Sequence, residues 1–219
     1  DTVQTTLTSY TLGSNVENLT YTSSSDFTGT GNASANTLTG NAGDDTLDGG
    51  AGADTLTGGA GSDTASYSSS SEAVSVNLSS GSTSGGDAAS DTLSSIENIT
   101  GSAYADTLIG DGSANTLTGG AGSDVLSAGG GADTLTGGAG DDTLNGGSGA
   151  DTLAGGDGTD TVSYAGASSG ATVNLSSGAV SGSAEGDSFS SMENLDGSAH
   201  ADTLTGDASA NTLTGGAGD

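Results

Sequence analysis

The sequence contains no lysine and no arginine, and a single histidine is its only basic side chain. Against this stand 28 aspartates and glutamates, which give a formal net charge of −28 at pH 7. A surface of one negative sign repels nucleic acids and anionic lipids, so we expect neither among the partners. Because no basic side chain neutralises the carboxylates, we expect the folded state to require an external cation.

Cysteine and proline are also absent, and aromatic residues make up only 3% of the chain. Without cysteine there are no disulfides and no thiolate metal sites, so any interaction that stabilises a small hydrophobic core must be non-covalent. The lack of proline is typical of a chain in which nearly every backbone N–H is bonded in sheets or turns. No apolar run reaches the roughly 18 residues of a membrane span, so we expect no membrane insertion.

With 42 glycines and 30% hydrophobic residues, the composition taken alone is typical of a disordered linker. The order of the residues indicates the opposite. From Gly119 to Ser163 the sequence divides by nines into GGAGSDVLS, AGGGADTLT, GGAGDDTLN, GGSGADTLA and GGDGTDTVS. A linker would scatter aspartate and leucine over all nine positions, so the constant phase predicts a folded repeat protein.

Further copies of this nonapeptide form three blocks, at 31–66, 101–163 and 197–219. Position eight is almost always leucine, with Ala65 and Val162 as exceptions. Position six is aspartate, replaced in a few copies by asparagine. The glycines at positions one, two and four tolerate positive φ, and the x-Leu-x end alternates one inward residue with two outward ones. We therefore expect each copy to form a six-residue turn and a three-residue strand.

These copies resemble the RTX, or haemolysin-type, calcium-binding nonapeptide repeats, whose pattern is GGxGxD followed by x-apolar-x. The resemblance implies an all-β fold, a parallel β-roll or β-solenoid with two nonapeptides in each coil and Ca²⁺ ions held at the GGxGxD turns. Turns eighteen residues apart, such as those of Asp45 and Asp63, would then lie about 4.8 Å apart.

Two carboxylates and several loop carbonyls can supply the six to eight oxygens that Ca²⁺ takes. We therefore expect multiple Ca²⁺ ions, bound mainly by the position-six residues. These candidate metal ligands are Asp45, Asp54, Asp63, Asp106, Asp124, Asp133, Asp142, Asp151, Asp160, Asp202, Asn36 and Asn115.

Two stretches without nonapeptides, which we call interludes, cover 67–100 and 164–196 and resemble each other. Val74 and Val76 alternate with polar residues in the first, as Ala171 and Val173 do in the second. This period of two is typical of half-buried strands. We expect the solenoid to continue through the interludes in wider coils, and residues 1–30 to be the end of another one.

A Glu-Asn-Leu or Glu-Asn-Ile trio occurs in each of these non-nonapeptide stretches, at 17–19, 97–99 and 193–195. Its asparagines are interpreted either as inward residues that bond along a turn or as caps of the coil before a calcium block. Neither tandem nonapeptides nor interludes contain a linker or hinge. The sequence is therefore interpreted as a single elongated β-solenoid domain over 1–219.

The sequence gives no sign of an enzyme active site. His200 is the only histidine and occupies the place that Tyr104 takes in the parallel copy, which favours a tolerant structural position. With one histidine there is no zinc-binding constellation and no Ser-His-Asp triad. Paired carboxylates can serve acid catalysis, but a pair that recurs along the whole chain favours metal binding.

Outward threonines recur in Thr-Leu-Thr strands, and flat threonine ranks could bind ice or a polysaccharide. Threonine is also a good strand former that keeps a surface soluble, and Ala, Ser, Asn and Asp interrupt the ranks. Ice or polysaccharide binding is therefore the less favoured alternative.

We expect a non-enzymatic, calcium-binding structural segment of a large secreted or cell-surface bacterial protein, such as an adhesin stalk, a surface-layer subunit or a filament subunit. The resemblance implies export by a type I route and an extracellular location. At millimolar calcium and a Kd of about 10⁻⁴ M, each site would add roughly 1.4 kcal/mol to folding. The alternative is the secretion and folding module of an enzyme or toxin, such as a metalloprotease, lipase or haemolysin.

Both ends of the sequence lie within repeats or interlude-like sequence. We expect the chain to be a segment of a longer polypeptide, continued by further repeats or by head-to-tail self-association.

Overall fold

The computed structural model describes residues 1–218, so Asp219, the last residue of the third predicted block, lies outside the described residues. The chain divides into two compact halves, 1–110 and 111–219. Both consist of short strands joined by turns, and the first half also contains the 3₁₀ helix η1 (Gly86–Ala88). The all-β prediction is confirmed. None of the described residues belongs to a helix long and apolar enough to cross a membrane.

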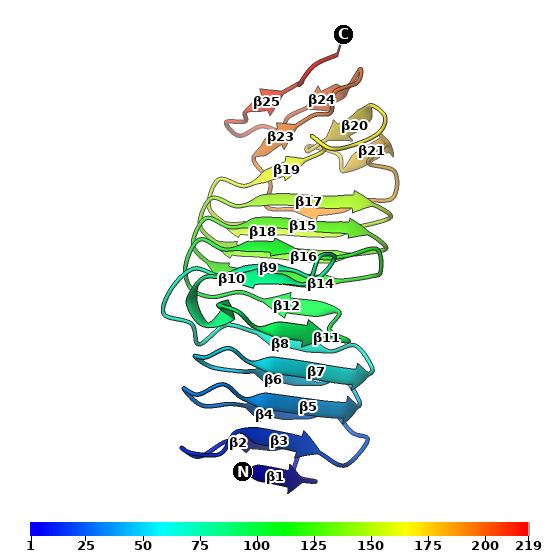
Figure 1. The fold of residues 1–219 in the computed structure, drawn as a ribbon. Coiled ribbons are helices and arrows are strands. Elements are labelled where there is room, and N and C mark those ends of the chain that lie inside the picture. Colours follow the sequence, from blue (N-terminus) through cyan, green and yellow to red (C-terminus); the bar gives the residue numbers. More distant parts are fainter. Residues whose placement is uncertain (219) are drawn as a thin grey trace. The chain divides into compact units, whose positions relative to one another are not determined.

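The first half contains three sheets, which we name 1A, 1B and 1C (Figure 1). Sheet 1A is formed in order by β1 (Thr2–Thr5), β3 (Asn18–Tyr21), β5 (Thr37–Ala42), β7 (Thr55–Ala60) and β11 (Thr92–Ser94). Sheet 1B is formed by β2 (Ser9–Thr11), β4 (Thr28–Thr30), β6 (Thr46–Asp48), β8 (Thr64–Ser66) and β12 (Asn98–Thr100). Sheet 1C is formed by β10 (Ser82–Ser84), β9 (Ser75–Asn77) and β13 (Thr107–Ile109).

The second half repeats this plan in sheets that we name 2A, 2B and 2C. Sheet 2A is formed by β14 (Thr116–Ala121), β16 (Thr134–Ala139), β18 (Thr152–Asp157) and β22 (Ser188–Ser190). Sheet 2B is formed by β15 (Val125–Gly130), β17 (Thr143–Ser148), β19 (Thr161–Ser163), β23 (Asn194–Asp196) and β25 (Leu213–Thr214). Sheet 2C is formed by β21 (Ala179–Gly182), β20 (Ala171–Asn174) and β24 (Thr203–Thr205).

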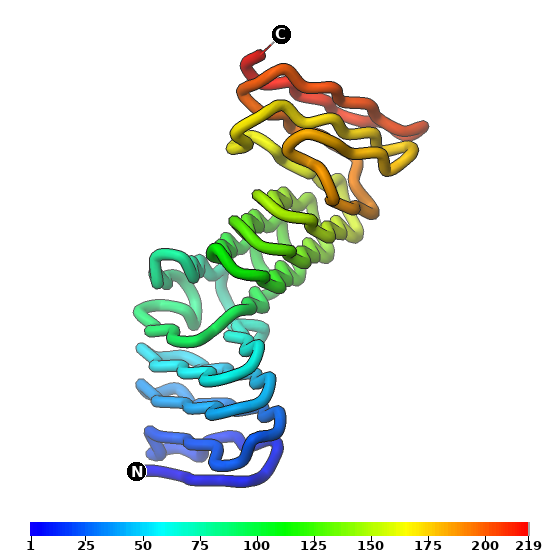
Figure 2. Tube along the Cα trace, turned by 90° about the vertical axis from the view of Figure 1, so that its right-hand side faces the viewer, coloured from blue at the N-terminus to red at the C-terminus, as the bar shows by residue number. Residues whose placement is uncertain are grey.

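Successive nonapeptides alternate between an A sheet and a B sheet, so two of them complete one coil. In sheet 1A, Leu38 of β5 pairs with Leu56 of β7, eighteen residues later, and the strands are parallel. In sheet 2A, Leu135 of β16 pairs with Leu153 of β18 in the same way. Figure 2 shows the coils of the first half as successive loops along the blue and cyan part of the trace. The predicted parallel β-roll with two nonapeptides in each coil is therefore confirmed.

Most nonapeptide strands place their position-eight side chain in the core between two sheets, although Leu213 of β25 is 43% exposed. Leu38, Leu56, Leu117 and Leu135 are fully buried, whereas Val125, at the outward position seven, is 47% exposed. This alternation follows from the period of two of a β-strand. Burial of one such leucine stabilises the fold by about 1.5–3 kcal/mol, and the stack repeats this contribution coil after coil.

The interludes are wider coils, as predicted. Leu56 of β7 pairs with Leu93 of β11, a spacing of two ordinary coils, and the excursion between them forms the hairpin β9–β10. The second interlude forms the hairpin β20–β21 in the same place. Both hairpins are antiparallel, which the sequence patterns did not predict. Val76 and Val173 are fully buried, in agreement with the predicted inward alternation.

Each interlude also moves the roll to a new face. Sheet 1A ends at β11, sheet 1B continues into β12, and sheet 1C begins with the hairpin and gains β13. In the second half, sheet 2A ends at β22, sheet 2B continues into β23, and sheet 2C begins with its hairpin and gains β24. A single elongated solenoid over 1–219 stays a prediction.

Candidate metal centre

The position-six residues stand just before the strands and form one row along each sheet. Row 1A contains Asn36 and Asp54, row 1B contains Asp45 and Asp63, and row 1C contains Asp106. Row 2A contains Asn115, Asp133 and Asp151, row 2B contains Asp124, Asp142 and Asp160, and row 2C contains Asp202. The structure therefore brings together the members of each row.

One carboxylate oxygen of most row aspartates accepts a hydrogen bond from the backbone of the preceding coil. The N–H of Asp45 donates to Oδ1 of Asp63 at 2.8 Å. The N–H of Asp133 donates to Oδ1 of Asp151 at 2.9 Å. The same bond recurs from Asp124 to Asp142 and from Asp142 to Asp160, at 2.8 Å in both cases. Oδ1 thus fixes the orientation of each carboxyl group.

The other oxygen of most of these carboxyl groups is buried and has no hydrogen-bond donor in the part of the chain that the structure describes. This holds for Oδ2 of Asp45, Asp54, Asp63, Asp133, Asp142, Asp151 and Asp160. These aspartates are at most 2% exposed. A buried carboxylate oxygen with no donor is strongly destabilising unless a proton or a cation reaches it.

Burial accordingly raises the pKa of these groups. Desolvation, opposed by the hydrogen bond from Phe27 and assisted by the charge of Asp63, raises the pKa of Asp45 to about 6. Desolvation raises the pKa of Asp54 to about 7 against the hydrogen bond from Asn36, with the charge of Asp91 adding to the rise.

The same causes act in the second half. Burial raises the pKa of Asp133 to about 6, although the backbone of Asn115 donates a hydrogen bond to it. Burial also raises the pKa of Asp142, Asp151 and Asp160. The surroundings of these carboxyl groups therefore favour the protonated form. A bound cation would instead stabilise the carboxylate.

In most copies a glycine at position one provides the space for the orphaned oxygen, whereas Ala128 takes this position in the copy of Asp133. A methyl group added at Gly40 would collide with Oδ2 of Asp45 and would lie 2.8 Å from the carbonyl oxygen of Gly58 in the next coil. A methyl group at Gly137 would collide with Oδ2 of Asp142 and lie 2.7 Å from the carbonyl oxygen of Gly155. Two electronegative oxygens from neighbouring coils therefore converge beside a glycine α-carbon.

This donor set fits calcium. Among residues 1–218, no three His, Asp or Glu side chains gather as a metal-binding group, so the carboxylates are offered in pairs along a row. Ca²⁺ takes six to eight oxygens and accepts carbonyl ligands, whereas Mg²⁺ requires near-octahedral geometry. The paired carboxylates and the loop carbonyls would hold the ion, which would supply the missing positive charge.

Four of the predicted ligands lie in loops that satisfy them from within. Ser102 donates its N–H and hydroxyl to the carboxylate of Asp106, and Ser198 does the same for Asp202. The side-chain oxygens of Asn36 and Asn115 accept the N–H of the position-two residues Asn32 and Asp111.

A glycine at position two is replaced by serine, asparagine or aspartate in all four of these copies. Burial acts against ionisation of Asp202, but the hydrogen bonds from Ala171 and Ser198 outweigh it and hold its pKa below the usual value. These loops can therefore fold with less need of a cation.

The rows contain members that the sequence analysis missed. Asp54 donates its N–H to Oδ1 of Asp91 at 2.8 Å, and Asp151 donates its N–H to Oδ1 of Asp187 at 3.0 Å. The signal for the first was present, because Asp91-Thr-Leu repeats the Asp-Thr-Leu of the nonapeptides. Glycines at positions two and four are lacking before it, which concealed the register.

The glutamates of the Glu-Asn-Leu trio also occupy position six. Asp63 donates its N–H to Oε2 of Glu97, and Asp160 donates to Oε2 of Glu193, both at 2.9 Å. Asn98 therefore takes position seven and donates to the hydroxyl of Ser62 in the neighbouring coil at 2.9 Å. The trio is the position-six-to-eight strand of the interlude, with glutamate in the place of aspartate.

Tyrosines bind the missed aspartates at the A sheets. Tyr67 donates its hydroxyl to Oδ2 of Asp91 at 3.1 Å, and Tyr164 donates to Oδ2 of Asp187 at 2.9 Å. Both tyrosines are at most 4% exposed. At these positions a phenol supplies the donor that the block aspartates lack.

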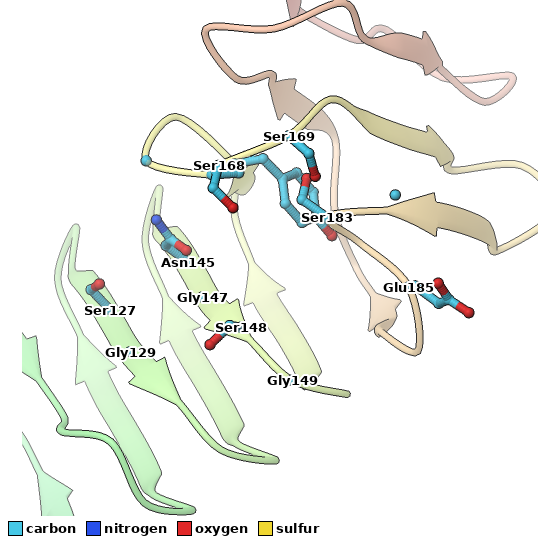
Figure 3. A pocket seen from close by; sticks show the side chains of 14 residues that line it. Ser127, Gly129, Asn145, Gly147, Ser148, Gly149, Ser168, Ser169, Ser183 and Glu185 are labelled. Carbon is cyan, nitrogen blue, oxygen red and sulfur yellow. The ribbon is translucent and has the colours of Figure 1, made fainter.

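The second half also contains a pocket of about 510 Å³ on the outer side of β15 and β17, under the second interlude. Ser168 and Ser169 of the interlude lie across from Asn145 and Ser148 of β17 (Figure 3). The lining offers hydroxyl and amide groups together with the carboxylate of Glu185. It can hydrogen-bond a polar molecule, but it does not contain the Asp oxygens of the rows.

Four copies of the RTX calcium-binding nonapeptide repeat match the sequence, at residues 30–65, 91–126, 127–162 and 193–219, together more than half of the chain. The matches coincide with the blocks, and those that begin at Asp91 and Glu193 also include the interlude strands β11 and β23. No curated protein gives a match to the chain.

Proposed function

Because the chain belongs to the RTX calcium-binding nonapeptide repeat family, we propose that it is a structural segment of a large secreted or cell-surface bacterial protein that folds and stiffens on binding extracellular Ca²⁺. An adhesin stalk, a surface-layer subunit and a filament subunit are the roles that suit such a segment. Calcium binding by a β-roll is common to the family, and the mechanical role is our proposal.

The orphaned carboxylate oxygens carry this proposal. Asp63 and Asp160 are fully buried, and Oδ2 of each has no donor among residues 1–218. The chain has neither lysine nor arginine to neutralise them. A divalent cation shared between neighbouring coils removes the repulsion along a row and joins one coil to the next, which makes a stack of thin layers stiff.

The proposed role would require an extracellular location, where calcium is millimolar. Each calcium site with a Kd of about 10⁻⁴ M would stabilise the fold by roughly 1.4 kcal/mol at millimolar calcium and by almost nothing at cytosolic calcium. A chain of this kind would stay extended during export by a type I route and would fold outside the cell. We propose this order of events for the chain.

The experiment that tests calcium-driven folding is a Ca²⁺ titration of the purified chain followed by far-UV circular dichroism. We expect β-sheet signal and a cooperative thermal transition to develop with calcium and to disappear in excess chelator. Mg²⁺ at the same concentration is the control, and we expect it to give little β-sheet. Unchanged β-sheet signal in chelator would contradict the proposal.

The second candidate is the secretion and folding module of an enzyme or toxin, such as a metalloprotease, lipase or haemolysin. Such a module would use the same calcium sites, so calcium binding does not separate the two roles. The full-length polypeptide separates them, because a catalytic domain beside the repeats would support the module and further blocks with interludes would support the structural role. Single-molecule stretching does not separate the two roles, but it tests a condition of the structural one, an unfolding force that rises with calcium.

A further inference from the structure

The rows on the A and B sheets end differently at each interlude, and the difference occurs in both halves. On the A sheets the last block loop meets an aspartate whose second oxygen is bound by Tyr67 or Tyr164. On the B sheets the last block loop meets Glu97 or Glu193. The two ends therefore offer a cation different surroundings.

On the B sheets the interlude supplies a carbonyl oxygen in the place of the next nonapeptide. A methyl group added at Gly58 would collide with the carbonyl oxygen of Ser95 and with Oδ2 of Asp63. A methyl group added at Gly155 would collide with the carbonyl oxygen of Ser191 and with Oδ2 of Asp160. This is the convergence seen inside the blocks, where Gly40 faces Oδ2 of Asp45 and the carbonyl oxygen of Gly58.

A buried orphaned oxygen is aimed into each of these places. Asp63 and Asp160 are 0% exposed, and Oδ2 of each has no donor. The charge of Glu97 lies close enough to Asp63, and that of Glu193 close enough to Asp160, to contribute to the raised pKa of each aspartate. Two carboxylates and a carbonyl are thus brought together without a positive charge.

The interlude serines hold the same unusual backbone conformation in both halves. Ser95 has φ 51° and Ser191 has φ 52°, values in the left-handed region that a serine seldom adopts. A strained conformation that recurs at the same position of two interludes is consistent with a functional role for the backbone carbonyl of this serine.

On the A sheets no interlude carbonyl is among the three atoms nearest to the equivalent place. The three atoms nearest to a methyl group added at Gly49 all belong to Asp54, and those nearest at Gly146 all belong to Asp151. The interlude carbonyl that follows in register, that of Gly182 in the second half, accepts the N–H of Glu185 within its own turn. The row therefore ends here on a tyrosine and an aspartate.

From these observations we propose that each interlude completes one additional calcium site at the B sheet, formed by Asp63, Glu97 and the carbonyl of Ser95 in the first half and by Asp160, Glu193 and the carbonyl of Ser191 in the second. The proposal rests on the proposed calcium-dependent folding and extends it beyond the GGxGxD loops. Each interlude coil would then bind a calcium ion at the B sheet, whereas at the A sheet its aspartate is hydrogen-bonded by a tyrosine.

The test uses Glu97→Gln, Glu193→Gln and the double variant of the whole chain. Glutamine keeps an oxygen that can accept the N–H of the preceding aspartate but removes the charge. The number of bound Ca²⁺ ions and their affinities are measured by calorimetric titration and by metal analysis after equilibrium dialysis. We expect each substitution to remove about one ion or to weaken one site by about tenfold or more. The matched controls are Glu72→Gln and Glu185→Gln, exposed glutamates of the same interludes, which we expect to bind as the wild type does.

Two results separate failure of this proposal from failure of the proposed function. A wild-type chain that neither folds with calcium nor binds it would overturn both. A wild-type chain that binds calcium, while the double variant binds the same number of ions with the same affinities, would overturn the interlude sites alone. A crystal structure of the wild-type chain with calcium gives a check that needs no variant to fold. Calcium at the block loops with none beside Ser95 and Ser191 would also overturn the interlude sites.

Discussion

The backbone N–H of Asp142 donates a 2.8 Å hydrogen bond to Oδ1 of Asp160, eighteen residues later and one coil further along sheet 2B. Oδ2 of the same Asp160 is buried without a donor. The fold thus uses one oxygen of each carboxylate to set the register between coils and leaves the other for a cation. Structure and metal binding are therefore linked in a single side chain.

The first prediction concerns Asp142→Asn. The asparagine oxygen can still accept the N–H of Asp124, and its amide can donate toward the carbonyl of Gly155, so the calcium-free fold gains stability. The lost charge weakens calcium binding at the loop by about tenfold or more. Calorimetric titration and thermal melts in chelator measure the two effects.

Asp141→Asn is the matched control for this substitution, because Asp141 precedes Asp142 in the same loop and is exposed. We expect a much smaller change in calcium affinity there. Equal losses at the two positions would indicate that only the net charge matters, and would contradict the assignment of position six as the ligand.

The second prediction is a pH dependence with opposite signs with and without calcium. The pKa values of Asp45 and Asp54, about 6 and about 7 in the calcium-free fold, lie above the ordinary 3.8. The folded state therefore binds more protons than the unfolded state between about pH 4 and 7, so its stability rises as the pH falls through this window and is lost as the pH rises through 6 to 7.

Thermal melts in chelator at pH 8, 6.5 and 5 measure this effect, and we expect the Tm to increase toward pH 5. With calcium present, protons compete with the ion for the same oxygens, so calcium affinity should fall over the same range. A Tm in chelator that is constant or falls toward pH 5 would contradict the buried, orphaned state of these carboxylates.

The third prediction is that Gly138→Ala at position two of its loop is strongly destabilising. Gly138 has φ 122°, and a methyl group there would collide with the carbonyl oxygen of Gly120 in the preceding coil. The cost should be at least about 1–3 kcal/mol, measured as a loss of Tm in calcium. Gly112→Ala is the control, since it has open space around it and lacks positive φ, and it should change stability little.

The regular coils could be predicted from the sequence because two simple rules coincide in them. Leucine at position eight, as in Leu38 and Leu56, sets the inward face, and the constant nine-residue phase brings equal positions together in successive coils. The interlude strands were harder to place. Asp91 and Glu97 occupy position six, but the residues before them lack the glycine pattern, and only the pairing with β7 and β8 reveals their register.

The sequence also did not predict which carboxylates receive hydrogen bonds from nearby side chains and loops. Asp106 and Asp142 look alike by position, yet the hydroxyl and N–H of Ser102 bind Asp106. The serine at position two of this copy is the feature of the sequence that could have indicated these bonds. Whether it binds the carboxylate depends on the direction of its backbone N–H, which a pattern of residue types does not contain. The tyrosine bound to Asp187 depends in turn on a contact across 23 residues.

The last prediction concerns this contact, through Tyr164→Phe. The substitution removes the hydroxyl that donates to Oδ2 of Asp187 at 2.9 Å and leaves a buried carboxylate oxygen without a donor. We expect a loss of about 1–3 kcal/mol. The loss should be nearly constant from about 0.1 to 10 mM calcium, because the bond closes the row without a metal ion.

Thermal melts over this calcium range measure the loss, with Tyr104→Phe as the control, because Tyr104 is 47% exposed. The hydrogen bond from Tyr164 also lowers the pKa of Asp187, although burial raises it more strongly. Its removal should raise that pKa further, so the variant should recover part of its stability as the pH falls and Asp187 takes up a proton. A loss that grows or shrinks steeply with calcium would instead place Asp187 in a metal site, and the A and B sheets would then end their rows in the same way.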